Sequence, residues 1–515
     1  MNDLTISALS PEERVRLLDS RSDSDSDSPV LARQYFPGSN RVERSYSPVQ
    51  YIRSIRWGSL AAHLAWFLVP SFLQSRIMRE PIRPAKLGPT AYLDGIRGVA
   101  ALIVYFFHFS YQSFGTAHAW GYNGKHYEIM CLPFLSLSFG GPAAVSIFFI
   151  ISGYALSYKP IKNMRSGNVR DFSTGLSSMV FRRVIRLFLP TTISTFAIVS
   201  LVRTGVYDWS RDIATSPIYF KGFREPHTPR LPTAYEQWVE WARTVYEAFR
   251  VFSWEHWAGF RQYDLHLWTI PYEFRCSLYL FLILMGTARL QSRYRLLTLA
   301  IVMCFTYAHS RWDFLLFLSG MALVEWDHIR GAHVSAPALP LEEREKGAKP
   351  TQSTTMRVFW HLLGVLALYL MCQPQDGGDV TPGWVYLTSL IPEWWDAAKY
   401  RYWQGVGSVL FVLTVGHSAW LQRVFNSSFA QYFGKISFSL YLMHGPVTKV
   451  IGYHFQKWVW DMTGVEGNSY ILGFYLGAMF CVPTVIWFAD VFWRAVDIPT
   501  VKFARWVENK AIKVD

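Results

Sequence analysis

Cysteine is scarce in this chain and forms none of the patterns that its usual chemistry needs. Only 5 of the 515 residues are Cys, they are scattered, and none belongs to a CxxC pair. An odd, scattered set argues against a disulfide framework, and the missing CxxC pairs argue against a zinc site. We therefore expect neither a structural disulfide nor a bound metal.

Charged residues are also few, and their placement argues against a soluble nucleic-acid-binding protein. Charged side chains make up 17% of the chain, whereas 51% is hydrophobic and 17% is aromatic. The 22 Trp and 28 Tyr suit the two interfaces of a lipid bilayer. Although the formal net charge is +13, the basic residues cluster beside apolar segments. This pattern indicates membrane topology and contact with lipids, and no nucleic-acid partner is expected.

The N-terminal region lacks the apolar core and cleavage site of a secretory signal peptide. It is polar and includes a Ser/Asp run from Asp19 to Ser28, so we expect a disordered cytosolic tail over residues 1–50. Within residues 51–91, the apolar stretch 57–73 has basic residues on both sides. We expect an amphipathic or re-entrant segment at the cytosolic face there.

Ten apolar segments of spanning or near-spanning length recur along residues 92–495, with no internal repeat. They lie at about 98–114, 139–158, 187–202, 267–287, 296–310, 312–325, 358–372, 403–420, 436–452 and 470–492. Lys and Arg accumulate in cytosolic loops, and the loop after the second segment is strongly basic whereas 373–402 is acidic. The sequence predicts an all-α polytopic membrane bundle of about ten transmembrane helices with both termini cytosolic.

The remaining stretches are expected to be accessory to this bundle. Residues 203–266 have balanced charge and several Pro, which predicts a lumenal cap of short interfacial pieces. Residues 327–357 are polar enough for a solvated cytosolic loop, and 496–515 form a basic cytosolic tail. We expect a multi-pass integral membrane protein of the endoplasmic reticulum or another endomembrane. The sequence specifies no oligomeric state.

His108 is the strongest chemical candidate, because a titratable group inside a spanning helix costs about 3 kcal/mol and needs a reason. Arg97 and His108 are eleven residues apart, which places the imidazole about 16 Å deeper along a helix than the guanidinium. This spacing suits a long donor such as an acyl-coenzyme A, with its phosphates at the cytosolic mouth and its thioester beside a histidine base. A plain hydrogen bond to a neighbouring helix explains a lone buried His equally well.

Five sequence blocks, in order, resemble the acyltransferase 3 family of membrane proteins. Residues 92–108 resemble its opening Arg–ten residues–His signature, and the other blocks are SIFFIISGYALSY from Ser146, FRRVIRLFLP from Phe181, LWTIPYEFRCSLY from Leu267 and ISFSLYLMHGP from Ile436. The resemblance is closest to fungal-type, single-domain members. It implies transfer of an acyl group, usually acetyl from acetyl-CoA, to a hydroxyl of a carbohydrate, lipid or small natural product. It also implies that Arg97 and His108 are essential.

Further residues receive roles beside these two. Glu273 follows Pro271, which we expect to break its helix, and the carboxylate either orients His108 or the acceptor or serves as a structural partner of Arg275 or another buried cation. Close helix approach is expected at Ser152 and Gly153. The expected coenzyme A contacts are Arg97, Arg182, Arg183, Arg186, Lys159 and Ser152, and the expected acceptor contacts are Tyr441, His444, Trp268 and Asp94. Arg182 to Arg186 also set topology, so phosphate binding is one of two explanations for them.

Two other functions compete with this interpretation. A proton-coupled transporter or lipid-binding membrane protein would use the same buried His and Glu, although the clustered Arg residues and the absence of repeats favour the enzyme. A different membrane O-acyltransferase using longer acyl chains is the second. Since no G-x-S-x-G element is present, direct transfer from acyl-CoA as co-substrate is preferred over a covalent acyl-enzyme, and we expect no permanently bound cofactor.

Overall fold

The computed structural model describes residues 57–77, 87–253, 260, 262–332, 353–395 and 398–512. These residues fall into two compact units. The first contains helix α4 (Trp57–Leu68), and the second contains α5 (Ser71–Ile77) and every later helix. The expected disordered tail, 1–50, and most of the expected cytosolic loop, 333–352, lie outside the described residues.

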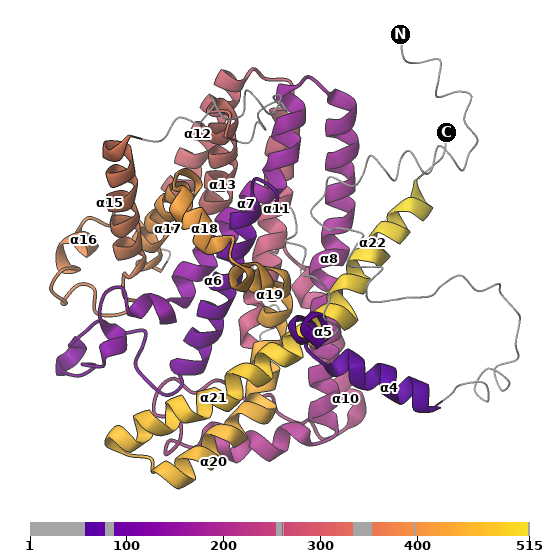
Figure 1. The fold of residues 1–515 in the computed structure, drawn as a ribbon, viewed down its shortest axis with the longest axis vertical. Helices are drawn as coiled ribbons and strands as arrows, with labels where there is room; N and C mark the ends of the chain where they lie inside the picture. The colour runs from indigo at the N-terminus through magenta and orange to yellow at the C-terminus, as the bar shows by residue number, and fades with distance from the viewer. Residues whose placement is uncertain are drawn as a thin grey trace, which may run out of the picture. The chain divides into compact units, whose positions relative to one another are not determined.

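Among the described residues, the regular structure of the second unit is helical, and loops connect its helices (Figure 1). The only β feature there is an isolated bridge between His118 and Asp376. Its longer helices are α6 (Ala91–Ser110), α7 (Gly141–Arg165), α8 (Val169–Arg203), α10 (Ala234–Phe249), α11 (Thr269–Gly286), α12 (Ser292–Ala308), α13 (Trp312–Ile329), α15 (Thr354–Met371), α17 (Arg401–His417), α19 (Ser428–Val447), α20 (Tyr453–Thr463), α21 (Gly467–Phe492) and α22 (Ile498–Ala511). Short helices are α9 (Arg211–Thr215), α16 (Val385–Ser389) and α18 (Ala419–Phe425).

All ten apolar segments overlap helices, which confirms the predicted all-α class. Five stretches among the described residues are long and apolar enough to cross a membrane, namely Ala91–Ser110, Gly141–Arg165, Val169–Arg203, Thr354–Met371 and Gly467–Ala511. The pair α17 and α18, bent by 102°, makes a sixth if it counts as one span. Helices α12 and α13 carry the buried ion pair of Arg295 and Glu325, and such interior charges lower the apolarity of a helix.

Close helix packing fixes the position of α6 in the bundle. Helix α6 packs against α19 and α7, and α7 packs against α13. A Cβ atom at Gly153 would lie 2.1 Å from the backbone oxygen of Phe317, and one at Gly320 would lie 2.2 Å from that of Ile150. The backbones of α7 and α13 therefore touch, which confirms the close approach predicted at Gly153.

The region expected to form a lumenal cap contains several helices, and its position at the lumenal face stays a prediction. Within 203–266 the chain forms a turn of 3-10 helix at Val206–Ser210, then α9, α10 and a second 3-10 turn, η5 (Leu265–Trp268). Helix α10 begins with a capping box in which Thr233 and Glu236 exchange side-chain-to-backbone hydrogen bonds. The basic tail is helical over α22, which continues from α21 through a π-helical turn at Trp493–Asp497.

The stretch 57–73 is interrupted between α4 and α5, next to Pro70. Helix α4 has 12 residues, or about 18 Å of rise, and so is shorter than the hydrocarbon core of a bilayer. Its placement at the cytosolic face stays a prediction.

We expect Gly153→Ala to destabilise the bundle, because the added methyl group meets backbone rather than a movable side chain. Overpacking of this kind costs about 1–3 kcal/mol, measurable as a lower thermal midpoint in detergent. Gly175→Ala in α8 is the matched control, since nothing lies within 4 Å of a Cβ there. Equal midpoints for Gly153→Ala and wild type would contradict the close packing.

Candidate active site

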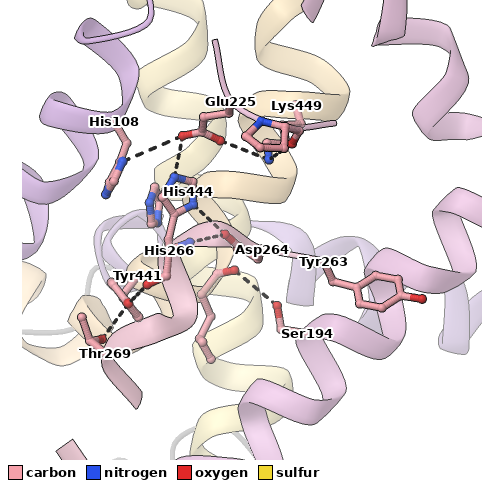
Figure 2. Close-up of polar contacts among 12 residues, drawn as sticks. His108, Ser194, Glu225, Tyr263, Asp264, His266, Thr269, Tyr441, His444 and Lys449 are labelled. Carbon is pink, nitrogen blue, oxygen red and sulfur yellow. Dashed lines mark hydrogen bonds and ion pairs between the residues drawn. The ribbon is translucent and has the colours of Figure 1, made fainter. Parts of the chain in front are cut away.

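Three histidines from three separate elements meet in one pocket (Figure 2). His108 lies near the end of α6, His266 lies in η5, and His444 lies near the end of α19. The ring centroid of His266 is 4.0 Å from that of His108 and 4.5 Å from that of His444, and the other two rings are 5.4 Å apart. The pocket is also lined by aromatic and polar side chains: Tyr105, Phe109, Gln112, Glu225, Thr448, Lys449 and Tyr453.

Local structure explains how each ring reaches the pocket. Asp264 caps η5 by accepting a 2.9 Å hydrogen bond from the backbone N–H of His266. After α19, the chain makes a π-helical turn at Thr448–Gly452 before α20 begins. Lys449 lies in this turn and is buried with its ammonium directed into the same site. π-Helical turns are frequent at functional sites.

Glu225 links the charged groups of the pocket. Its Oε1 atom lies 2.7 Å from Nε2 of His266 and 3.9 Å from Nδ1 of His108, and Oε2 lies 3.1 Å from Nζ of Lys449. The Tyr111 hydroxyl donates a short hydrogen bond to the same Oε1. The carboxylate side chain is only 1% exposed, so it requires this cationic and hydrogen-bonding environment.

His266 lies between two carboxylates, since its Nδ1 is 2.6 Å from Asp264 Oδ1 while Nε2 faces Glu225. Burial lowers the pKa of His266, but the two carboxylates more than offset it and raise that pKa to about 9. Burial raises the pKa of Glu225, yet His266 and Lys449 hold it well below its usual range. The same cations keep the pKa of Asp264 low. His266 is therefore a charged imidazolium at neutral pH.

The other two histidines keep nitrogen atoms available. His444 directs Nδ1 at its own helix, 3.2 Å from the Leu440 backbone oxygen, and its buried Nε2 has no hydrogen-bond partner among the described residues. Nδ1 of His108 likewise has no hydrogen bond among them. The His108 side chain is 19% exposed and the His266 side chain 2%, so His108 is the more accessible of that pair.

The structure brings together three of the residues singled out in the sequence. His108 and His444 share the pocket, and the ring of Tyr441 lies 5.8 Å from that of His444. The Tyr441 hydroxyl donates to the backbone oxygen of His266 and lies 2.7 Å from the hydroxyl of Thr269. Tyr441 therefore fixes η5 against α19.

Of the alternatives expected for Glu273, the structure shows the pairing with a cation other than Arg275. Glu273 accepts hydrogen bonds from Arg183 at 2.7 Å and from the Ser152 hydroxyl at 2.9 Å, while Arg275 pairs with Asp313 at 3.3 Å. The carboxylate beside His108 is Glu225. The expected helix break at Pro271 is wrong, because α11 runs unbroken from Thr269 and the proline occupies its first turn, where no backbone N–H is needed.

The other predicted binding residues lie away from the histidines. Arg97 pairs with Asp94 at 3.1 Å at the opposite end of α6 and donates to the Gly434 backbone oxygen at 3.3 Å. Arg182 pairs with Glu508 of α22 at 3.3 Å.

Trp268 is also outside the lining of the histidine pocket. Its ring lies 5.5 Å from that of Tyr272 and 6.3 Å from that of Trp312. The expected binding roles of Arg186 and Lys159 stay predictions.

Sequence reasoning missed Glu225, His266 and Lys449, which line the pocket, and Asp264, which contacts His266. His266 and Asp264 precede the block LWTIPYEFRCSLY by one and three residues. Their proximity to this family-like segment could have identified them as candidate site residues. Glu225 belongs to a Pro-rich loop with no local pattern.

The three histidines also form a group that could hold a metal ion, since one nitrogen of each lies within 4.8 Å of the others. Three imidazoles are a common zinc ligand set. However, both nitrogens of His266 already face carboxylates, and Lys449 adds a cation beside Glu225. As an imidazolium, His266 offers no lone pair to a metal ion, and the absence of a metal stays a prediction.

Comparison with known proteins adds independent information. A family model described as "Acyltransferase domain", of the acyltransferase 3 type, matches residues 90–490. The chain is 31% identical over 464 residues to O-acetyltransferase PaAT-1 of Phomopsis amygdali, covering 87% of this chain and 89% of the relative. It is 25% identical over 468 residues to acyltransferase R4 of Phoma sp. and 27% identical over 474 residues to acyltransferase clz18 of Cochliobolus lunatus, in each case covering 83% of this chain and 97% of the relative. No solved structure matches.

The raised pKa of His266 predicts a pH-dependent stability. Its imidazolium stabilises the folded state fully below about pH 6.5, the ordinary value, and this contribution is lost as pH rises through about 9. The difference in thermal midpoint between wild type and His266→Gln in detergent should therefore shrink from pH 6 to pH 10. His361→Gln, at an exposed site on α15, is the control. A midpoint difference that stays constant over this range would refute a charged His266.

Proposed function

The chain belongs to the acyltransferase 3 family and is an acyltransferase, and on that premise we propose that it transfers an acetyl group from acetyl-CoA to an acceptor hydroxyl, with His108 as general base. The acceptor class is a small molecule, lipid or carbohydrate. The name of the Phomopsis relative, an O-acetyltransferase, supports the choice of acetyl and hydroxyl.

The observation that supports the proposal is that the three histidine rings have different polar contacts. His266 has both nitrogens against carboxylates, so it has no free lone pair with which to accept a proton. His108 retains a partly exposed ring and lies on the helix that also carries Arg97. His444 is buried beside it and is suited to contact the acceptor.

Transfer then follows in one addition and one elimination. Nε2 of His108 takes the proton of the acceptor hydroxyl while the hydroxyl oxygen attacks the thioester carbonyl carbon. The adjacent imidazolium of His266 stabilises the negative charge that develops on the carbonyl oxygen. The carbon–sulfur bond breaks, and the coenzyme A thiolate takes the proton from His108. No covalent acyl-enzyme is formed.

The donor would bind along α6. Its phosphates would contact Arg97, Arg182, Arg186 and Lys159, and its pantetheine arm would carry the thioester over about 16 Å towards His108. Arg183 is assigned a different task, because it is held by Glu273 and by the hydroxyl of Ser277 at 3.1 Å. Acyl-CoA acts as a co-substrate, and no cofactor is permanently bound.

For the membrane arrangement we propose ten spans with both termini cytosolic, in the endoplasmic reticulum or another endomembrane. Two observations support it. Each of the ten apolar segments overlaps a helix, and the basic loop after α7 follows the distribution of cytosolic charge.

His108→Gln should lower transfer by about 10²- to 10⁴-fold, the usual contribution of a general base, without unfolding the protein. Detergent-purified protein is incubated with isotope-labelled acetyl-CoA and host-cell extract, and acetylated products are measured by mass spectrometry. His361→Gln is the matched control and should retain full activity.

Full transfer by His108→Gln would exclude this base. Repeating the assay with butyryl- and palmitoyl-CoA tests the donor, since a preference for palmitoyl-CoA would contradict acetyl transfer.

A further inference from the structure

Glu225 reaches the active site from the cap, and no transmembrane helix carries it. It lies in the loop between α9 and α10, yet its side chain is 1% exposed among residues of α6, η5 and the turn after α19 (Figure 2). A loop carboxylate buried this deeply is expensive unless it has a task that the bundle residues do not fulfil.

The loop is attached directly to the chain that follows His108. The backbone N–H groups of Gly222 and Phe223 donate to the backbone oxygens of Gln112 and Tyr111, at 2.8 and 2.9 Å. Gln112 in turn donates its side-chain amide to the His108 backbone oxygen at 3.0 Å. The positions of Glu225 and His108 are therefore coupled through few, short contacts.

Gly222 is the residue that makes this attachment possible. A Cβ atom there would lie 2.2 Å from the backbone oxygen of Tyr111, so any other residue would push the loop away from the segment that follows α6. The loop is fixed at a second point, where Lys449 donates to the Pro226 backbone oxygen at 3.2 Å. Glu225 lies between the two attachment points.

The contacts of Glu225 leave it no role as a proton acceptor. Its Oε1 faces His266, Tyr111 and His108, and Oε2 faces Lys449. What it supplies to His108 is a negative oxygen on the Nδ1 side, 3.9 Å away. A carboxylate there favours the Nδ1–H tautomer and leaves the Nε2 lone pair for the acceptor. Such contacts are often long without substrate and tighten when it binds.

We propose that the cap is part of the catalytic machinery, because Glu225 is a positioning residue that orients His108 and fixes its tautomer. The proposal rests on the proposed function, in which His108 is the base. Glu225 itself does not touch the reacting atoms. Its second effect is to hold His266 as an imidazolium beside the same ring.

The test compares four variants by coenzyme A release from acetyl-CoA at a fixed amount of host-cell extract. Glu225→Gln should lower kcat by about 10- to 100-fold, the usual effect of losing an orienting partner, and leave the KM for acetyl-CoA within about twofold. Glu225→Asp should recover part of the lost kcat. Gly222→Ala should also lower kcat, since it displaces the loop. Glu247→Gln, which changes a half-buried carboxylate of α10 that pairs with Arg250, should match wild type.

Three results would overturn the proposal. They are an unchanged kcat in Glu225→Gln, an Asp variant no better than the Gln variant, and a Gly222→Ala variant with wild-type kcat. If Glu225→Gln does not fold, the Asp and Gly222→Ala variants decide the question.

His108→Gln in the same assay distinguishes a failure of the proposed function from a failure of the role proposed for Glu225. An active His108→Gln contradicts the proposed function. An inactive His108→Gln together with a fully active Glu225→Gln contradicts only the role of Glu225.

Discussion

The buried contact between Glu225 and His266 is the interaction on which the candidate active site depends. It joins the cap to the short turn before α11, and Lys449 and Asp264 complete a set of two carboxylates and two cations. Such a set is stable in a low-dielectric interior only when every charge is paired. Removing one member of this set leaves an uncompensated charge beside His108 and His444. The same four side chains therefore determine both the geometry of the pocket and its electrostatics.

The pocket contains three histidines, and their neighbours give each of them a different set of contacts. Two carboxylates make His266 a fixed cation. A backbone carbonyl of its own helix takes up one nitrogen of His444 and leaves the other directed away. His108 has its single carboxylate neighbour at 3.9 Å and keeps a partly exposed ring. The roles proposed for the three histidines therefore rest on contacts at a few ångströms.

The sequence predicted features that depend on a local pattern of residues or on the free-energy cost of burying a titratable group. Apolar length located all ten helical segments, and the expense of a buried titratable group singled out His108 and His444. Contacts between distant parts of the chain were not predictable in this way. Glu225 and Lys449 are separated by more than two hundred residues and carry no spacing that relates them. Glu273 pairs with Arg183 at 2.7 Å, whereas Arg275, two residues along the chain from Glu273, pairs with Asp313. Neighbours at i and i+2 point to different faces of a helix.

The most direct test of acyl transfer at His108 is a cryo-electron microscopy map of the purified protein with a non-transferable thioether analogue of acetyl-CoA. We expect the acyl carbon in the pocket lined by His108, His266 and His444, with the phosphates at the Arg97 end of α6. An analogue whose acyl carbon lies outside this pocket, away from His108, would contradict it.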